Sequence, residues 1–293
     1  MPVSADALRP SPWTERRVIA YAHQGGAWEA PSSTLHAIAA ALEAGATGIE
    51  LDVHATADGR LVVTHDPTVD RTTDHAGAIA DLTWAELAVL DNAYWWAPGA
   101  DVSPGLAPEE YPLRGRAPKD HRFGIALLEE VLEEFPGVVL NLDIKQTAPV
   151  VAPYEEALAA LLRRFHRVDD VIVASFLDSA TEVFSTFAPE VPTSAGTAAV
   201  AAFYQAVQAG ESPAPSAHVA LQVPARFGAM TLVDRRFVEV AHDQGLAVHV
   251  WTIEDEDEMR DLCALGVDGI ITDRPTALVG VLDELGCAWH PGG

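Results

Sequence analysis

Short apolar runs rich in β-branched residues alternate with stretches of helical periodicity along most of the chain, and this alternation limits the folds open to it. Such alternation is typical of repeated βα units around a mostly parallel sheet. The strand-like runs lie at residues 18–23, 48–53, 61–65, 138–144, 171–175, 191–194, 219–223, 246–251 and 269–272. The helical patterns lie at residues 34–44, 154–165, 181–187, 200–208, 235–244, 255–264 and 276–285.

The chain length favours an α/β fold of the TIM type, a (β/α)8 barrel. Barrels of this class have about 250 residues, and the chain has 293, so we expect one catalytic domain over residues 1–293. Nine strand-like runs are one too many for eight barrel strands. We expect the run at 191–194 or the run at 269–272 to be the extra one. The runs at 48–53 and 61–65 are joined by the tight turn Ala57-Asp58-Gly59, which leaves no room for a helix.

Residues 92–124 fit no βα repeat. The segment is rich in proline, glycine and charge, and a loop of this length in a compact domain is usually functional or disordered. We therefore predict an insertion after the third strand that lies over the active-site mouth. Its aromatic residues Tyr94, Trp95 and Trp96 either cap the pocket or only pack the insertion onto the barrel.

The charge balance excludes some partners. The chain has 43 acidic and 18 basic residues, a formal charge of -25, so we expect no binding of nucleic acid or anionic membranes. Residues 1–17 lack the pattern of a signal peptide, and no segment has the length and apolarity of a membrane span. Cys263 and Cys287 have no metal-ligand spacing. These features predict a cytoplasmic protein without stable membrane insertion.

Two strand-like runs carry acidic residues in an alternating pattern. Residues two apart in a strand share a face, so Glu50 and Asp52 lie side by side, as do Asp143 and Lys145. Like charges held this close favour a cation between them, and hard oxygen ligands suit Mg²⁺ or Ca²⁺. The lysine is placed to contact a phosphate. Ordinary salt bridges at strand ends are the alternative interpretation.

Two histidines follow strand-like runs in the same way. His23 ends the run at 18–23 and precedes two glycines, and His65 ends the run at 61–65. A single histidine is more often structural than catalytic. However, active sites of these barrels lie at the C-terminal ends of the strands, where we also expect Asp52, Lys145 and Trp251.

These residues fall in motifs that resemble the glycerophosphodiester phosphodiesterase family. The resemblance covers nearly the whole chain in order. Its motifs are His23-Gln24-Gly25, Pro31-Ser32-Ser33-Thr34, Glu50-Leu51-Asp52-Val53, Thr56-Ala57-Asp58-Gly59, His65-Asp66, Arg71-Thr72-Thr73, Asp143-Ile144-Lys145, Ser175-Phe176, Trp251-Thr252 and Thr272-Asp273-Arg274-Pro275.

The resemblance implies a TIM-type barrel that hydrolyses glycerophosphodiesters to an alcohol and glycerol 3-phosphate. It assigns acid-base catalysis to His23 and His65, and divalent-metal binding to three carboxylates. Lys145 is a phosphate contact in this assignment, and Trp251 forms a wall of the pocket. The three metal ligands that it implies are Glu50, Asp52 and Asp143.

Three positions depart from the family pattern. The family's arginine after the first histidine is Gln24, so a bidentate phosphate clamp becomes a neutral amide. A glutamate is replaced by Ser32, and the third ligand is Asp143 in place of a glutamate. We therefore expect Lys145 and Arg71 to carry more of the phosphate binding, with Gln24 nearby.

Other residues and functions stay open from the sequence alone. Gln222 ends a strand-like run and is a candidate substrate contact; His249 shares a face with Trp251 and is expected to fill the barrel interior. His54 is either a pocket residue or a loop histidine. A lysophospholipase D or sphingomyelinase D-like lipid hydrolase is a second function, and a non-catalytic binding protein is a third. The sequence predicts no oligomeric state.

Overall fold

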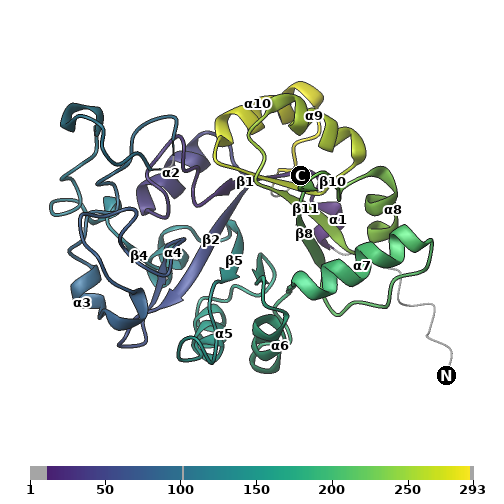
Figure 1. Ribbon diagram of the computed structural model, residues 1–293, viewed down its shortest axis with the longest axis horizontal. Helices are drawn as coiled ribbons and strands as arrows, with labels where there is room; N and C mark the ends of the chain where they lie inside the picture. Colours follow the sequence, from purple (N-terminus) through teal and green to yellow (C-terminus); the bar gives the residue numbers. More distant parts are fainter. Residues whose placement is uncertain (1–11, 101, 291–293) are drawn as a thin grey trace.

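The structure is a computed structural model in which residues 12–100 and 102–290 are described. Eight parallel strands form one curled sheet (Figure 1). They are β1 (Ile19–His23), β2 (Gly48–Ala55), β5 (Val139–Ile144), β6 (Val171–Ala174), β7 (Ser194–Ala195), β8 (Ala220–Pro224), β11 (Ala247–Trp251) and β12 (Gly269–Thr272). Neighbours pair in the order β6-β5-β2-β1-β12-β11-β8-β7.

The two end strands of this order, β6 and β7, also meet. They share one isolated parallel bridge, between Val173 and Thr193, in place of a ladder. The α/β class and the curled parallel sheet of a TIM-type fold are therefore confirmed.

The extra strand is not one of the two that we expected. The run at 191–194 contributes the bridge to β6 and the start of β7, and the run at 269–272 is β12, which pairs with β1 and β11. The extra strand is β3 (Leu61–Val63), which pairs antiparallel with β2. A tight turn, in which Gly59 has a φ of +76°, joins the two strands. Strands joined by such a turn are antiparallel, so β3 cannot be a barrel strand.

The chain between β2 and β5 forms an excursion to one side of the sheet, drawn in blue to teal in Figure 1. Besides β3 it contains η2 (Ile79–Asp81), α3 (Trp84–Leu87), η3 (Pro108–Glu110), η4 (His121–Phe123), β4 (Ala126–Leu127) and α4 (Leu128–Glu134). The segment 92–124 therefore lies between the second and third parallel strands. It packs on the loop after β1: the indole of Trp96 donates to the carbonyl of Ala27 at 2.9 Å, and the side-chain amide of Asn92 donates to Ser32.

Helices cover the outside of the sheet, and all seven predicted helices are confirmed. They are α2 (Leu35–Glu43), α5 (Glu155–Arg164), α6 (Asp178–Phe187), α7 (Thr197–Ala209), α8 (Arg235–Asp243), α9 (Glu256–Leu265) and α10 (Pro275–Leu285). The short helices α1 (Pro12–Glu15), α3 and α4 were not predicted. Thr34 caps α2, because its hydroxyl accepts from the amide of Ala37 at 3.1 Å.

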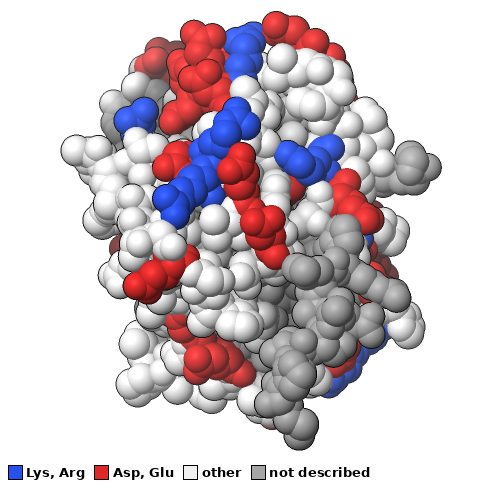
Figure 2. Space-filling view, turned by 90° about the vertical axis from the view of Figure 1, so that its right-hand side faces the viewer, with Lys and Arg blue, Asp and Glu red and all other residues white. Residues whose placement is uncertain are grey.

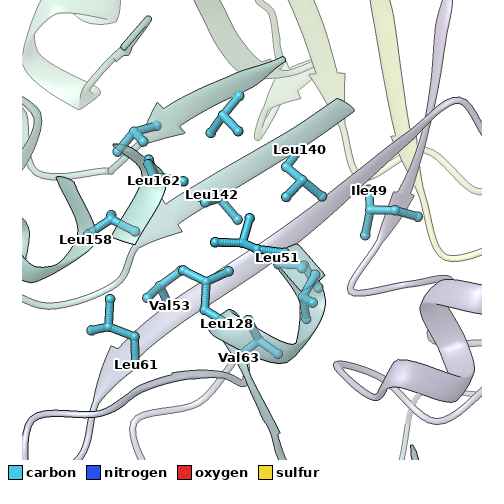
Figure 3. Packing of buried hydrophobic residues seen from close by; sticks show 14 of the residues in the cluster. Ile49, Leu51, Val53, Leu61, Val63, Leu128, Leu140, Leu142, Leu158 and Leu162 are labelled. Atoms are coloured by element: carbon cyan, nitrogen blue, oxygen red, sulfur yellow. The ribbon is translucent and has the colours of Figure 1, made fainter. Parts of the chain in front are cut away.

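The hydrophobic core explains which face of each strand is free for function. The odd-numbered residues of β2 and the even-numbered residues of β5 pack against α4 and α5 (Figure 3). The labelled members are Ile49, Leu51, Val53, Leu61, Val63, Leu128, Leu140, Leu142, Leu158 and Leu162. Because side chains alternate along a strand, the polar residues of β2 and β5 must face the inside of the curled sheet.

Charged side chains of both signs lie interspersed on the face shown in Figure 2. Within residues 12–100 and 102–290, no helix combines the length and apolarity needed to span a bilayer. Residues 1–11, where most of the N-terminal segment without a signal-peptide pattern lies, are outside the described residues.

Candidate functional site

Strand register brings the predicted carboxylates together on the inside of the sheet. His23 pairs with Glu50 across β1 and β2, and Asp52 pairs with Asp143 across β2 and β5. Glu50 pairs in turn with Asn141. All five residues line one cavity. The alternation and the register together therefore place side chains from three strands next to one another.

Lys145 neutralises part of this cluster. Its Nζ lies 2.8 Å from Oδ1 of Asp52 and 3.1 Å from Oδ2 of Asp143. Burial would lower the pKa of Lys145, but the charges of Asp52 and Asp143 outweigh it and raise the pKa. Burial also raises the pKa of Asp143, against the charge of Lys145. The ammonium is therefore held charged beside two buried carboxylates.

A carboxylate holds the ring of His23 at its Nδ1 atom. Its Nδ1 lies 2.7 Å from Oδ1 of Asp273, and its Nε2 lies 3.8 Å from Oε2 of Glu50. Burial would lower the pKa of His23, but the hydrogen bond to Asp273 and the charge of Glu50 raise it to about 9. Burial and the charge of Asp52 raise the pKa of Glu50.

The turn after His23 explains why two glycines follow Gln24. A Cβ at Gly25 would lie 2.8 Å from the Cβ of Ala37, and one at Gly26 would lie 2.7 Å from the ring of Pro275. Both glycines also have positive φ values. Gln24 itself is buried, and its side-chain nitrogen lies 3.1 Å from Nε2 of His23.

His65 reaches the site by a route that differs from the predicted one. It does not end a parallel strand; β3 ends at Val63 and runs back along β2. The amide of Thr64 donates to the carbonyl of Asp52 at 3.1 Å, so the returning chain brings His65 to the level of the carboxylates. The ring centroids of His23 and His65 are 6.2 Å apart.

Residues around His65 fix its position. Its Nδ1 lies 2.7 Å from Oδ1 of Asp66, whose other oxygen accepts from Nε of Arg71 at 2.6 Å. His54 lies in β2, so it is neither a loop residue nor among the residues that line the cavity. Its Nε2 is 3.4 Å from the carbonyl of His65.

The cavity at this edge of the sheet has a volume of about 850 Å³. Ten site residues were predicted from the sequence, and eight of them line it: His23, Glu50, Asp52, His65, Asp143, Lys145, Gln222 and Trp251. The other two, Gln24 and Arg71, do not line the cavity. Gln24 contacts His23, and Arg71 contacts Asp66, which is bonded to His65. None of the described residues of segment 92–124 lines the cavity. Trp95 and Trp96 join the segment to the rest of the protein through hydrogen bonds to the carbonyls of Thr73 and Ala27, whereas Tyr94 packs on Trp95 within the segment.

Neutral polar side chains form the floor of the cavity. The amide of Asn141 donates to Oε1 of Gln222 at 3.1 Å, and Nε2 of Gln222 lies 3.3 Å from Nδ1 of His249. His249 is fully buried, as predicted, and burial lowers its pKa to about 4. Its ring lies 5.2 Å from that of Tyr21.

The carboxylates have the donor chemistry of a site for a hard divalent cation. Oδ2 of Asp52 and Oδ1 of Asp143 are buried and have no hydrogen-bond partner among the described residues, and Glu50 lies beside them. Lys145 forms ion pairs with two of the three carboxylates, those of Asp52 and Asp143. In the part of the chain that the structure describes, no three Asp, Glu, His or Cys side chains already have the arrangement of a metal site. The donor set thus fits the predicted metal, while the cationic partner seen here is the lysine.

Sequence reasoning missed two groups of residues. Asp66 and Asp273 were quoted in motifs but given no role. Asp66 directly follows His65 in its motif, whereas Asp273 lies in a different motif from His23 and meets it only in the fold. The second group is the apolar side of the cavity, formed by α7 and a small hairpin of β9 (Arg226–Phe227) and β10 (Met230–Thr231). No motif marks those residues.

A sequence model described as the Glycerophosphoryl diester phosphodiesterase family matches residues 23–277. A glycerophosphodiester phosphodiesterase from Caldanaerobacter subterraneus subsp. tengcongensis is 29% identical over 278 residues, which cover 92% of this chain and 100% of the relative.

Solved structures share the fold. The glycerophosphoryl diester phosphodiesterase domain of an uncharacterized protein from Mycobacterium tuberculosis superposes with a TM-score of 0.76 at 21% identity, covering 92% of this chain and 99% of that one. A phosphodiesterase from Oleispira antarctica, solved in complex with the product sn-glycerol-3-phosphate, has a TM-score of 0.65 at 22% identity, covering 90% and 96%.

Proposed function

Because the chain belongs to the glycerophosphoryl diester phosphodiesterase family, we propose that it hydrolyses glycerophosphodiesters to an alcohol and glycerol 3-phosphate. The observation that carries the proposal is the pair of histidines, with ring centroids 6.2 Å apart, beside three carboxylates and a lysine in one cavity. The product bound to the Oleispira antarctica phosphodiesterase supports the same substrate class.

The two histidines supply the proton transfers. In each ring Nδ1 is tied to a carboxylate, that of Asp273 or Asp66, so Nε2 is the atom that acts on the substrate; in His23 a substrate takes the place of the Gln24 amide, which lies 3.1 Å from Nε2. One histidine removes the proton from the attacking oxygen, which belongs to water or to the glycerol hydroxyl of the substrate. The other gives a proton to the leaving alkoxide as the phosphorus–oxygen bond breaks. The carboxylates keep each ring oriented.

The phosphate is bound by cations at the same edge of the sheet. Among the described residues that line the cavity, Lys145 is the one lysine or arginine; its Nζ contacts Asp52 and lies 5.7 Å from the ring centroid of Phe176. We include Gln24 and Arg71 in the phosphate-binding region because each contacts a histidine directly or through Asp66.

A divalent metal, Mg²⁺ or Ca²⁺, is part of the proposal. Glu50, Asp52 and Asp143 would hold it, because they are the buried oxygen donors of the cavity. When bound, such an ion polarises phosphoryl oxygens and neutralises charge that develops on them. Lys145 adds a fixed positive charge on the same group, and the two histidines perform the proton transfers.

One catalytic domain carries the site, and we propose that segment 92–124 is an insertion that stabilises the loop after His23. Its contacts with Ala27 and Ser32 support this role. Because the segment does not line the cavity, we expect it to act on the position of the loop and not on the substrate directly.

The test is an assay of the purified protein with glycerophosphocholine in Mg²⁺, Ca²⁺ or a chelator. We expect metal-dependent release of choline and glycerol 3-phosphate, lost in His23→Ala and in His65→Ala. Release of neither product under every metal condition would exclude the proposed reaction. A folded His23→Ala variant, checked by circular dichroism, separates loss of chemistry from loss of structure.

A further inference from the structure

One side of the cavity carries almost no charge, and the proton transfers do not use it. This apolar wall is formed by one face of α7, the ends of β7 and β8, and the hairpin of β9 and β10. Its apolar members are Ala195, Val200, Ala201, Tyr204, Val223, Pro224, Phe227, Met230 and Leu232. Glycerol and phosphate are polar, so the reacting part of a glycerophosphodiester has no use for this surface.

Helix α7 contributes a continuous stripe to the wall. Tyr204 follows Val200 by four residues and Ala201 by three, which places it on the same side of the helix as both, and all three line the cavity. The neighbouring face carries Phe203 and Val207, which are buried in the protein core. The helix is thus apolar toward both the core and the cavity.

The hairpin closes the wall with two exposed side chains. Phe227 and Met230 pair directly across β9 and β10, so their side chains lie on the same face, and both line the cavity. The side chain of Phe227 is 71% exposed and that of Met230 is 43% exposed. The hydroxyl of Tyr204 donates to the carbonyl of Thr231 at 3.4 Å, which joins the helix to the hairpin.

The wall begins directly beside the charged site. Trp251 pairs with Pro224 of the wall across β11 and β8, and its ring lies 5.5 Å from that of Phe176, edge to face; the ring of Phe176 lies 5.7 Å from Nζ of Lys145. A phosphate bound at Lys145 would therefore have an apolar substituent within reach of the wall. The cavity volume of about 850 Å³ lies in the range of sites that enclose a whole small molecule.

We propose that the apolar wall binds the aliphatic chain of an amphiphilic glycerophosphodiester, a monoacyl lipid with a zwitterionic head group, while its phosphodiester lies at Lys145. The inference rests on the proposed function, which it narrows to a substrate class. The formal charge of -25 favours a zwitterionic head group over an anionic one. The wall, and not the aromatic segment 92–124, is the part of the structure that fits the chain.

The first experiment varies chain length on one head group. Choline release is measured from glycerophosphocholine and from its 1-hexanoyl, 1-octanoyl and 1-decanoyl derivatives, all below their micelle concentrations. We expect kcat/KM to rise about two- to fourfold for each added methylene that the wall covers. Equal values along the series would overturn the proposal.

Variants test which residues cover the chain. Phe227→Ser, alone and with Met230→Ser, is expected to lower the decanoyl-to-glycerophosphocholine ratio of kcat/KM about tenfold or more. Val89→Ser is the matched control, because Val89 is 70% exposed and does not line the cavity. An unchanged ratio in the folded double variant would overturn the proposal.

A binding measurement separates the subsite from the reaction. Titration calorimetry with octyl-, decyl- and dodecylphosphocholine, which contain no glycerol, is expected to give affinities that rise with chain length and fall in Phe227→Ser. If binding follows chain length but no choline is released from any glycerophosphodiester, the subsite stands and the proposed hydrolysis fails. If binding shows no dependence on chain length, the subsite is refuted whatever the activity.

Discussion

The two sides of the cavity are built in different ways. The charged side consists of strand residues such as Glu50, Asp52 and Asp143, which parallel register places side by side. The apolar side consists of one face of α7 and the exposed hairpin that carries Phe227. Strand geometry fixes the charged groups to within the spacing of neighbouring strands, which acid-base chemistry requires. An aliphatic chain needs only apolar area, which a helix and a hairpin provide.

The first consequence concerns the histidines on the charged side. His65→Ala is expected to lower kcat for glycerophosphocholine by about 10²- to 10⁴-fold, the usual contribution of a general acid or base. The measurement is steady-state kinetics. His54→Asn is the matched control, because the hydrogen bond of His54 goes to the backbone of His65 and His54 does not line the cavity. Equal losses in both variants would mean that His65 acts through structure and not through chemistry.

A second consequence separates the two cations near the phosphate. Lys145→Met is expected to lower kcat/KM about 10²- to 10³-fold, because a fixed positive charge at the phosphoryl oxygens is lost. Arg71→Ala should weaken turnover far less, since Arg71 does not line the cavity and is joined to His65 through Asp66. Kinetics of the two variants on one substrate provide the measurement. Full activity in Lys145→Met would refute the assignment.

The charged side could be predicted from the sequence because its information is local. In a strand, alternation along 48–53 places Glu50 and Asp52 on one face, and the apolar residues on either side of them, Ile49, Leu51 and Val53, mark the face that packs in the core. The order of the family motifs along the chain predicted the remaining residues of the charged side. Eight of ten predicted residues line one cavity for this reason, and the seven predicted helices are present.

The sequence predictions failed for features that depend on tertiary structure. His65 was placed at the end of a barrel strand, whereas β3 runs antiparallel and returns His65 along β2. The tight turn at Gly59 contained that information, because it allows no parallel partner. The wall around Phe227 had no such signal: two apolar residues near a glycine turn do not tell which surface they face. Their role depends on where α7 and the hairpin meet in space.

A third consequence concerns metal binding at the charged side. A divalent ion that binds only the folded protein should raise its free energy of unfolding by about 2.7 kcal/mol at a concentration of 100 times Kd. Urea unfolding with Mg²⁺, Ca²⁺ or a chelator measures this. Asp52→Asn should abolish the effect, and Phe227→Ser should retain it. A metal effect that survives in Asp52→Asn would place the ion elsewhere.

The smallest effect is expected for the neutral floor of the cavity, where His249 makes the stability depend on pH. Burial lowers the pKa of His249 to about 4 from its ordinary value of 6.5. The unfolded chain therefore takes up a proton between these values while the folded protein does not. Stability from the neutral ring is present above pH 6.5 and is lost as the pH falls toward 4.

This loss of stability at lower pH can be measured by urea unfolding at pH 7 and pH 5. Between these values the wild type should lose about 2 kcal/mol more stability than His249→Gln, whose side-chain amide can still pair with Gln222. His75→Gln controls for the removal of one histidine at an exposed position. Parallel losses in wild type and His249→Gln would show that the floor takes up the proton without cost. In that case the floor of the cavity would accept charge as the charged side does, and it could no longer be contrasted with that side as neutral.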